Sequence, residues 1–209
     1  GLTFANGLRS IVRQDPDIIM VGEIRDAETA NIAIQSALTG HLVFSTLHTN
    51  DAPSAVTRLV NMQVEPFLVA SSVICVVAQR LVRLVCSNCG AEHEADDDEL
   101  TTFGLTPADN GQLAMRLANG ETRVGKLRKG PGCHECLNTG YTDRTTIHEI
   151  MTVTDRVKDL IMDKASAAEI KNDCVRGGML TLRQDALRKA LRGITTLEEV
   201  ARVTQRDLS

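Results

Sequence analysis

The stretch Asp17-Ile18-Ile19-Met20-Val21-Gly22-Glu23 decides the fold class of this chain. Its apolar run follows the turn signal Asp15-Pro16 and ends in a glycine and a glutamate. A short continuous apolar run of this kind is typical of a strand that is buried on both faces of a parallel sheet. We therefore expect a strand over residues 18–21, with Glu23 at its carboxyl end.

The sequence on the carboxyl side of this strand alternates between helix and strand patterns. We expect a helix from Asp26 to about Thr39, a strand over 41–47, a helix capped by Asn50 or Asp51, and a helix from Pro66 to about Gln79. Cys75 would lie on the apolar face of the last helix as a small buried hydrophobe. Strands and helices that alternate through short connections form right-handed crossovers, so the fold class is α/β with a parallel sheet.

The composition of the 209 residues is that of an ordinary globular protein, with 43% hydrophobic and 24% charged residues. A net charge of -4 disfavours general binding to nucleic acids, because no basic excess exists to neutralise a phosphate backbone. Aromatic residues make up only 2%, which argues against a stacking platform for single strands. No apolar run approaches the roughly 20 residues of a membrane span, so we expect a cytoplasmic protein that could dock on a membrane protein.

The composition changes at residue 86 and again near residue 146, and we expect three parts: 1–85, 86–145 and 146–209. The middle part is polar and turn-rich, and Asn119-Gly120 between two apolar-patterned segments predicts a hairpin. The last part is expected to be helical, with capping-box signals at Ser166–Glu169 and Thr196–Glu199.

Four of the six cysteines form two CxxC pairs, Cys86/Cys89 and Cys133/Cys136, with 43 residues between them. A CxxC turn directs two thiolates at one point, and two such turns complete a tetrahedral zinc site. Disulfides are disfavoured in a chain with no secretion signal, and two pairs favour a metal over a redox CxxC. We expect a structural zinc ion, because four protein ligands close the site.

Polar residues follow both predicted strands at the edge of the sheet where α/β proteins bind ligands. Glu23 could orient water or a hydrated Mg²⁺ ion against a terminal phosphate. The second strand ends in Ser45-Thr46-Leu47-His48-Thr49-Asn50, a cluster suited to sensing a γ-phosphate, in which we count Thr46 as a phosphate ligand. Each feature alone also fits a solvated acid or a structural histidine, and His41 and His48 carry no role on these grounds.

A resemblance to a known family gives these residues more weight. The chain closely resembles the secretion ATPase superfamily, in its type II secretion and type IV pilus assembly branch. The resemblance rests on Gly1–Ala5, Leu8–Asp26, Thr39–Ala52, Gln79–Arg83, the two CxxC pairs and Gly140–Arg144. By this resemblance Glu23 matches the Walker B glutamate, and His41 and His48 match the two histidines of the histidine box.

The resemblance implies a RecA-like P-loop ATPase core with an inserted tetracysteine zinc-binding subdomain and a helical C-terminal region. It also implies a homohexamer that hydrolyses ATP with Mg²⁺, assembles pilin-like subunits into a filament, and docks on an inner-membrane platform protein at the cytoplasmic face of the bacterial inner membrane. Glu23, His41 and His48 would then be catalytic, and Glu23 and Thr46 would bind the nucleotide and its metal. The tetracysteine element favours this branch over pilus retraction and effector-transfer ATPases, which generally lack it.

One departure from the family pattern is large, because no G-x-x-x-x-G-K-[ST] motif occurs in the 209 residues. The chain matches the family from the Walker B region onward, and we expect a fragment of a motor that is inactive alone. The alternative is a non-catalytic zinc-ribbon module that works as a scaffold. Glu23, His41 and His48 favour descent from an active enzyme, and the gene upstream of Gly1 would discriminate between the two.

Overall fold

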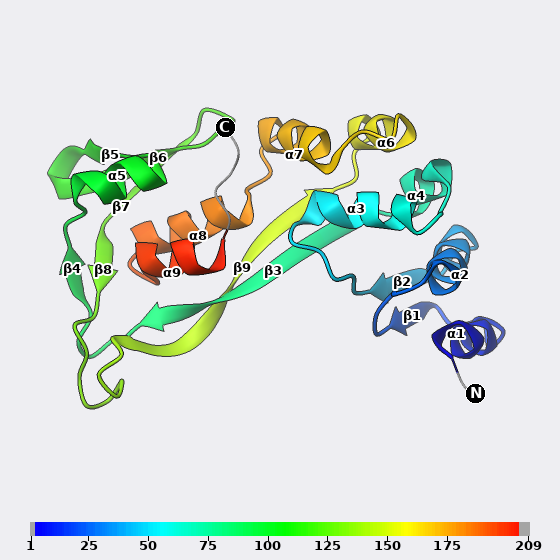
Figure 1. Ribbon diagram of the computed structural model, residues 1–209, viewed down its shortest axis with the longest axis horizontal. Coiled ribbons are helices and arrows are strands. Elements are labelled where there is room, and N and C mark those ends of the chain that lie inside the picture. Colours follow the sequence, from blue (N-terminus) through cyan, green and yellow to red (C-terminus); the bar gives the residue numbers. More distant parts are fainter. Residues whose placement is uncertain (1–2, 205–209) are drawn as a thin grey trace. The chain divides into compact units, whose positions relative to one another are not determined.

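The computed structural model describes residues 3–204 (Figure 1). Gly1 and Leu2 of the resemblance and residues 205–209 of the expected helical region lie outside the described residues. The chain divides into two compact units, which we call unit 1 (residues 1–77 and 150–174) and unit 2 (residues 78–149 and 175–209). In residues 3–204 no helix has both the length and the apolar character that a membrane crossing needs. The expected boundaries at residues 85 and 145 remain a prediction.

Unit 1 holds the mixed α/β part of the chain. Its elements are α1 (Phe4–Val12), β1 (Ile18–Val21), α2 (Ala27–Leu38), β2 (Leu42–Ser45), α3 (Ala52–Asn61), α4 (Pro66–Ser72), α6 (Asp155–Met162) and most of α7 (Ala167–Arg176). As expected, β1 and β2 pair in parallel, with Ile18 opposite Leu42 and Val21 opposite Ser45. The side chains of Asp26 and Asp51 cap α2 and α3 by accepting hydrogen bonds from backbone N–H groups of the first turn.

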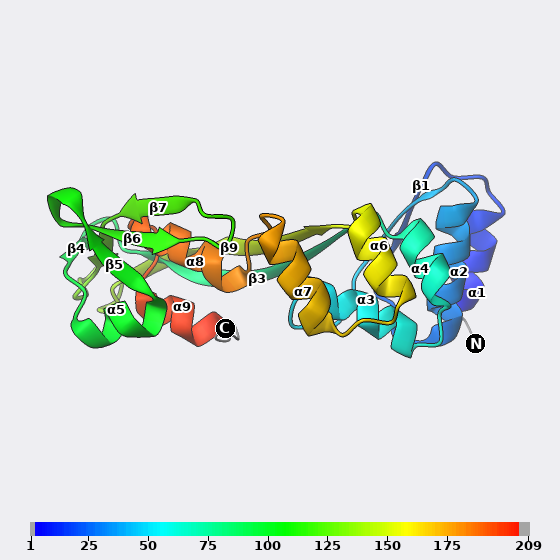
Figure 2. The same ribbon diagram turned by 90° about the horizontal axis from the view of Figure 1, so that it is seen from above.

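Helices cover one side of the β1–β2 pair. Figure 2 shows α6, α4, α2 and α1 in a row, and each packs against the next. Of these helices, α1 packs against β1 and α2 against β2. Ile19 and Val21 are buried, whereas Ile18 and Met20 are 60% and 77% exposed. The expectation that this strand is buried on both faces is therefore wrong for this chain, because no element in residues 3–204 covers the second face.

Unit 2 holds most of two long paired strands, β3 (Cys75–Val85) and β9 (Tyr141–Thr152). The first residues of β3 and the last residues of β9 belong to unit 1. Its other elements are β4 (Ala91–His93), α5 (Asp97–Phe103), β5 (Leu105–Ala108), η1 (Asp109–Gly111), β6 (Gln112–Arg116), β7 (Thr122–Gly125), β8 (Leu127–Lys129), α8 (Leu182–Leu191) and α9 (Leu197–Val203). The core forms where α8 and α9 pack on these strands, with Val82, Ile147, Ala186 and Val200 fully buried.

Two predictions about elements fail and one is confirmed. The helix expected to run to about Gln79 ends at Ser72, and residues from Cys75 onward form β3, so Cys75 is an exposed strand residue rather than a buried helical one. The long strand β9 has no counterpart among the sequence predictions, and the expectation of a helical region from residue 146 is wrong for residues 146–152, which belong to this strand. The hairpin at Asn119-Gly120 is present, since β6 and β7 pair antiparallel on either side of it.

Candidate functional site

Glu23 lies directly after β1 and is held by two neighbouring side chains. Its Oε2 atom is 2.7 Å from Nε of Arg25 and 3.0 Å from Nε2 of His48. The Glu23 side chain is 22% exposed, whereas the His48 ring is 80% exposed. The hydrogen bond from Arg25, and after it the bond from His48, hold the pKa of Glu23 below its usual range, so the carboxylate is ionised at neutral pH.

Thr46 joins the two strands at the same edge of the sheet. Its Oγ1 donates a hydrogen bond of 2.6 Å to the carbonyl oxygen of Gly22, and its own carbonyl accepts from the N–H of Ile24. The structure therefore brings together three of the expected nucleotide-site residues, Glu23, Thr46 and His48, from chain segments more than twenty residues apart in sequence.

His41 does not belong to this cluster. It precedes β2, whereas Thr46 and His48 follow that strand, so His41 lies at the opposite edge of the β1–β2 pair. Its Nδ1 atom is 3.0 Å from the carbonyl oxygen of Ser36, so that nitrogen carries a proton. This hydrogen bond ties the ring to the last turn of α2, away from Glu23.

The four CxxC cysteines form one cluster, in which the sulfur atoms lie within 4.8 Å of one another. We call Cys86–Cys89 the first knuckle and Cys133–Cys136 the second knuckle. The sulfurs of Cys133 and Cys136 are 3.7 Å apart, and each has a partner in the first knuckle at 3.9 Å. Tetrahedral zinc with Zn–S bonds of about 2.3 Å separates its sulfurs by about 3.8 Å. The cluster fits zinc, and all four cysteines are free thiols.

Hydrogen bonds favour the thiolate form in the second knuckle. Burial alone would raise the pKa of Cys136, but the backbone N–H groups of Cys133 and Gly140 outweigh burial and lower the pKa to about 6. The side-chain amide of Asn88 is the largest cause that lowers the pKa of Cys133. Burial raises the pKa of Cys89 to about 12. Since only thiolates bind zinc, the second knuckle is the more readily ionised half of the cluster.

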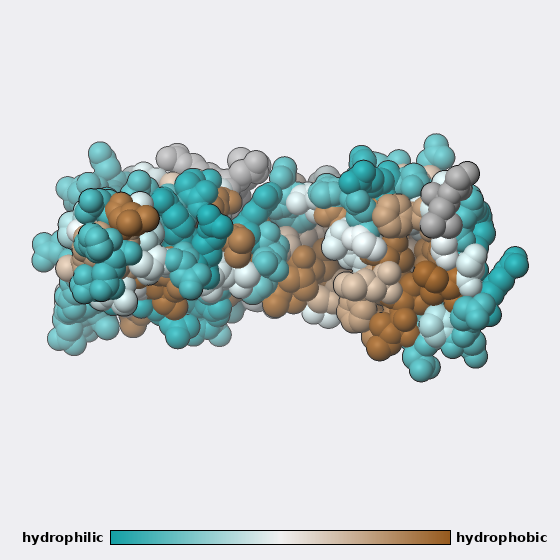
Figure 3. Space-filling model, turned by 90° about the horizontal axis from the view of Figure 1, so that it is seen from below, coloured by the Kyte–Doolittle hydropathy of each residue, from teal (hydrophilic) through white to brown (hydrophobic). Residues whose placement is uncertain are grey.

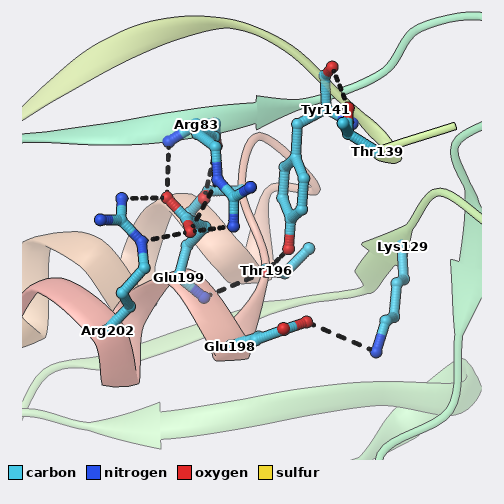
Figure 4. Close-up of polar contacts among 9 residues, drawn as sticks. Arg83, Lys129, Thr139, Tyr141, Thr196, Glu198, Glu199 and Arg202 are labelled. Carbon is cyan, nitrogen blue, oxygen red and sulfur yellow. Dashed lines mark hydrogen bonds and ion pairs between the residues drawn. The ribbon is translucent and has the colours of Figure 1, made fainter. Parts of the chain in front are cut away.

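Unit 2 contains a buried cluster of charged side chains whose contacts were not predicted from the sequence. The fully buried carboxylate of Glu199 accepts hydrogen bonds from the backbone N–H, Nε and Nη2 of Arg83 at 2.7–2.9 Å, and from Nε and Nη2 of Arg202 (Figure 4). Arg83 also lies 4.0 Å from the ring centroid of Tyr141, whose hydroxyl is 2.8 Å from that of Thr196. Arg83 and Tyr141 both fall in segments that carry the family resemblance, which is the one signal that could have singled them out.

Arg25 and Asn88 make two further contacts that were not predicted from the sequence. Each lies within a quoted motif, yet which atom it contacts depends on the fold. Arg25 reaches back two residues to Glu23, and Asn88 reaches across to the second knuckle.

Known proteins match this chain over nearly its whole length. The sequence profile of the family described as "Type II/IV secretion system protein" matches residues 1–202. The type IV pilus assembly ATPase PilB of Thermus thermophilus is 53% identical over 200 residues, which are 96% of this chain and 21% of that protein. The type II secretion system protein E of Pseudomonas aeruginosa is 47% identical over 206 residues, which are 99% of this chain and 38% of that protein. The chain thus spans about a fifth to two fifths of the length of these relatives.

Solved structures share the fold. The pilus retraction motor PilT with bound ADP superposes with a TM-score of 0.63 at 23% identity, over 98% of this chain and 44% of that one. The ATPase DotB of Legionella pneumophila superposes with a TM-score of 0.60 at 22% identity, over 96% of this chain and 42% of that one. Fold, sequence profile and high-identity relatives agree, and the chain belongs to the family of type II/IV secretion system proteins.

Proposed function

We propose that this chain is part of a hexameric motor ATPase that powers type II secretion or type IV pilus assembly by driving pilin-like subunits into a filament. Relatives named for both processes match nearly the whole chain, at 53% and 47% identity. These relatives favour the motor over the scaffold module. The observation that carries the proposal is the contact between Glu23 and His48 at the carboxyl end of two parallel strands.

Glu23 is proposed to act on the water molecule that attacks the γ-phosphate. Arg25 and His48 both contact its Oε2 atom, and among the described residues no hydrogen bond or ion pair is formed by Oε1. The anchored carboxylate therefore presents one oxygen that is free to orient water and accept its proton.

Thr46 and the two histidines are proposed to respond to the phosphate. The Thr46 hydroxyl donates its hydrogen bond to the carbonyl oxygen of Gly22, which leaves its oxygen lone pairs to accept a hydrogen bond from a water molecule of a hydrated Mg²⁺ ion. Mg²⁺ that arrives with ATP would supply charge neutralisation at the phosphates. His41, at the opposite edge of the strand pair, is proposed to couple the nucleotide state to neighbouring subunits rather than to grip the nucleotide.

The rest of the motor is proposed to come from outside these 209 residues. No P-loop motif occurs in them, so another part of the full-length protein would supply the phosphate cradle. We place the hexamer on the cytoplasmic face of the inner membrane, docked on a platform protein of the secretion or pilus machine.

The test of the catalytic role is Glu23→Gln in the full-length protein. The variant is expected to bind ATP as the parent does and to lose nearly all turnover, because the amide keeps the shape of the carboxylate but cannot accept the proton. Glu28→Gln, which changes an exposed acid on α2, is the matched control and should hydrolyse ATP normally. Hydrolysis by Glu23→Gln at the parental rate would show that Glu23 has another role.

The cysteine cluster is proposed to hold one structural zinc ion through Cys86, Cys89, Cys133 and Cys136. Cys86→Ser is expected to lose the metal and to unfold the surrounding loops, because the binding energy of such a site is also folding energy. Cys75→Ser, at an exposed thiol outside the cluster, should keep one zinc per chain. Metal analysis of both proteins decides, and a parent chain without zinc would contradict the proposal.

A further inference from the structure

We propose that Asn88 is a positioning residue of the metal site: its side-chain amide joins the first knuckle to the sulfur of Cys133 and strengthens the hold of the four cysteines on zinc. This inference rests on the proposed zinc site.

The contact is specific in its geometry. Asn88 lies between the two cysteines of the first knuckle, and its Nδ2 atom donates to Sγ of Cys133 at 3.2 Å. Within residues 3–204, Asn88 supplies the one side-chain nitrogen or oxygen that hydrogen-bonds to any of the four sulfurs. Cys136, in contrast, receives its hydrogen bonds from the backbone N–H groups of Cys133 and Gly140. Asn88 is therefore the donor that a substitution can remove.

The contact also spans the two halves of the site. Each knuckle closes on itself through a backbone bond, from the N–H of Gly90 to the carbonyl of Cys86 at 2.8 Å and from the N–H of Asn138 to the carbonyl of Cys133 at 2.8 Å. The knuckles are 43 residues apart in sequence. Besides the metal, the Asn88 amide is thus a direct link from one knuckle to a ligand atom of the other.

The chemistry of the site explains why such a donor matters. A zinc ion bound by four thiolates is an anionic complex, and N–H groups that point at the sulfurs disperse its charge. Removal of a partner that orients a metal ligand typically weakens metal binding by about tenfold to a hundredfold. Aspartate has nearly the shape of asparagine, but it lacks the N–H group and adds a negative charge beside the thiolates.

The experiment compares four variants of the 209-residue chain in competition with a zinc chelator. Asn88→Ala is expected to bind zinc about tenfold more weakly than the parent, and Asn88→Asp more weakly still. The matched controls Ser87→Ala and Ser87→Asp change the exposed neighbour in the same knuckle. Ser87→Ala should match the parent, and Ser87→Asp separates the effect of added charge from the loss of the donor.

Substitution with Co²⁺ provides the second measurement. At saturating metal, Asn88→Ala is expected to reach the parent's tetrahedral absorbance with a shifted sulfur-to-metal charge-transfer band, which shows an intact site with altered sulfur donors. Parental zinc affinity and an unshifted band in Asn88→Ala would overturn the role of Asn88 and leave the zinc site standing. A parent chain that binds neither zinc nor Co²⁺ would overturn the zinc site itself, and the inference with it.

Discussion

Glu199 shows how burial and ion pairing compete at a single residue. Its side chain is fully buried, which alone would raise its pKa, yet the hydrogen bonds from Arg202 and Arg83 lower the pKa from 4.5 to about 2. A carboxyl group with a depressed pKa in the folded state stabilises the protein above its unfolded pKa, and this contribution is lost as the pH falls toward the folded pKa. For Glu199 the window runs from pH 4.5 down to about 2.

We predict that Glu199→Gln lowers the free energy of unfolding at pH 7 by about 1.5 to 3 kcal/mol, because hydrogen bonds to a charged group are lost. The variant should also lose part of the acid dependence of stability between pH 4.5 and about 2. Denaturant unfolding followed across this pH range measures both effects. Glu198→Gln is the control: this neighbour is 64% exposed and 3.7 Å from Lys129, so its loss should cost under about 1 kcal/mol. Equal effects of the two variants would contradict this account.

The side-chain contacts that could be predicted from sequence are those between residues that are close in sequence. Asp26 and Asp51 cap the helices that follow them, because a cap acts within three residues of its own position. The Thr196–Glu199 capping box is half right: the N–H of Glu199 does bond to the Thr196 hydroxyl, but its carboxylate bonds to Arg83 instead. Arg83, one of the two arginine partners of Glu199, lies 116 residues away in sequence, and no local pattern could predict that contact.

At the level of elements, β3 shows where periodicity fails. The segment from Pro66 onward is an apolar-rich run that only Ser71 and Ser72 interrupt, and such a run is compatible with a buried helix or a strand. The β-branched residues Val73, Ile74, Val76 and Val77 favour a strand, and β3 indeed begins at Cys75. Its partner β9 could not be predicted either, because it contains Asp143, Arg144 and Thr145 and owes its conformation to pairing with β3.

We predict that two glycine-to-alanine changes have opposite effects on the elements that hold them. Gly140 has a φ of +78°, and a Cβ there would lie 2.2 Å from the carbonyl oxygen of Gly130, so Gly140→Ala should destabilise the knuckle loops by at least about 2 kcal/mol. Gly7 lies within α1 and a Cβ there meets nothing within 4 Å, so Gly7→Ala should stabilise the helix by about 0.5 to 1 kcal/mol. Amide hydrogen exchange in residues 130–140 and in α1 measures each effect locally, and faster exchange of α1 in Gly7→Ala would refute the second.

At the scale of the whole molecule, unit 1 exposes a hydrophobic surface on one face of the β1–β2 pair. Ile18, Met20, Leu42 and Phe44 share one face of the β1–β2 pair and are 43% to 77% exposed. Figure 3 shows hydrophobic residues gathered over this part of unit 1. The parallel pairing was predicted from sequence, but the bare face was not, because an apolar strand pattern does not say which chain segment covers it.

We predict that the 209-residue chain self-associates through this face. A contiguous apolar patch and an unpaired strand edge both promote association. Replacing Met20 and Phe44 by serine should shift the protein toward monomer in sedimentation experiments without unfolding it, since both side chains are already exposed. Leu137→Ser is the control, because Leu137 is 82% exposed at the second knuckle and stands outside the patch. A parent chain that sediments as a monomer at high concentration would refute the prediction.

The last prediction is that this chain alone binds ATP weakly or not at all, although it contains the proposed hydrolytic cluster. The residues that grip β- and γ-phosphates in P-loop proteins are a glycine-rich turn of backbone N–H groups and a lysine, and no segment of the 209 residues offers that combination. Glu23 carries a negative charge, and the neighbouring cation Arg25 is engaged with its Oε2 atom, as is the ring of His48, so these residues leave little net attraction for a polyphosphate. Titration with a fluorescent ATP analogue in the presence of Mg²⁺ measures the affinity, and Glu23→Gln serves as the internal control. If the chain bound the analogue at micromolar concentration and Glu23→Gln changed that affinity, the phosphate grip would have to lie within these strand ends, and the division of labour proposed between Glu23 and a separate cradle would be wrong.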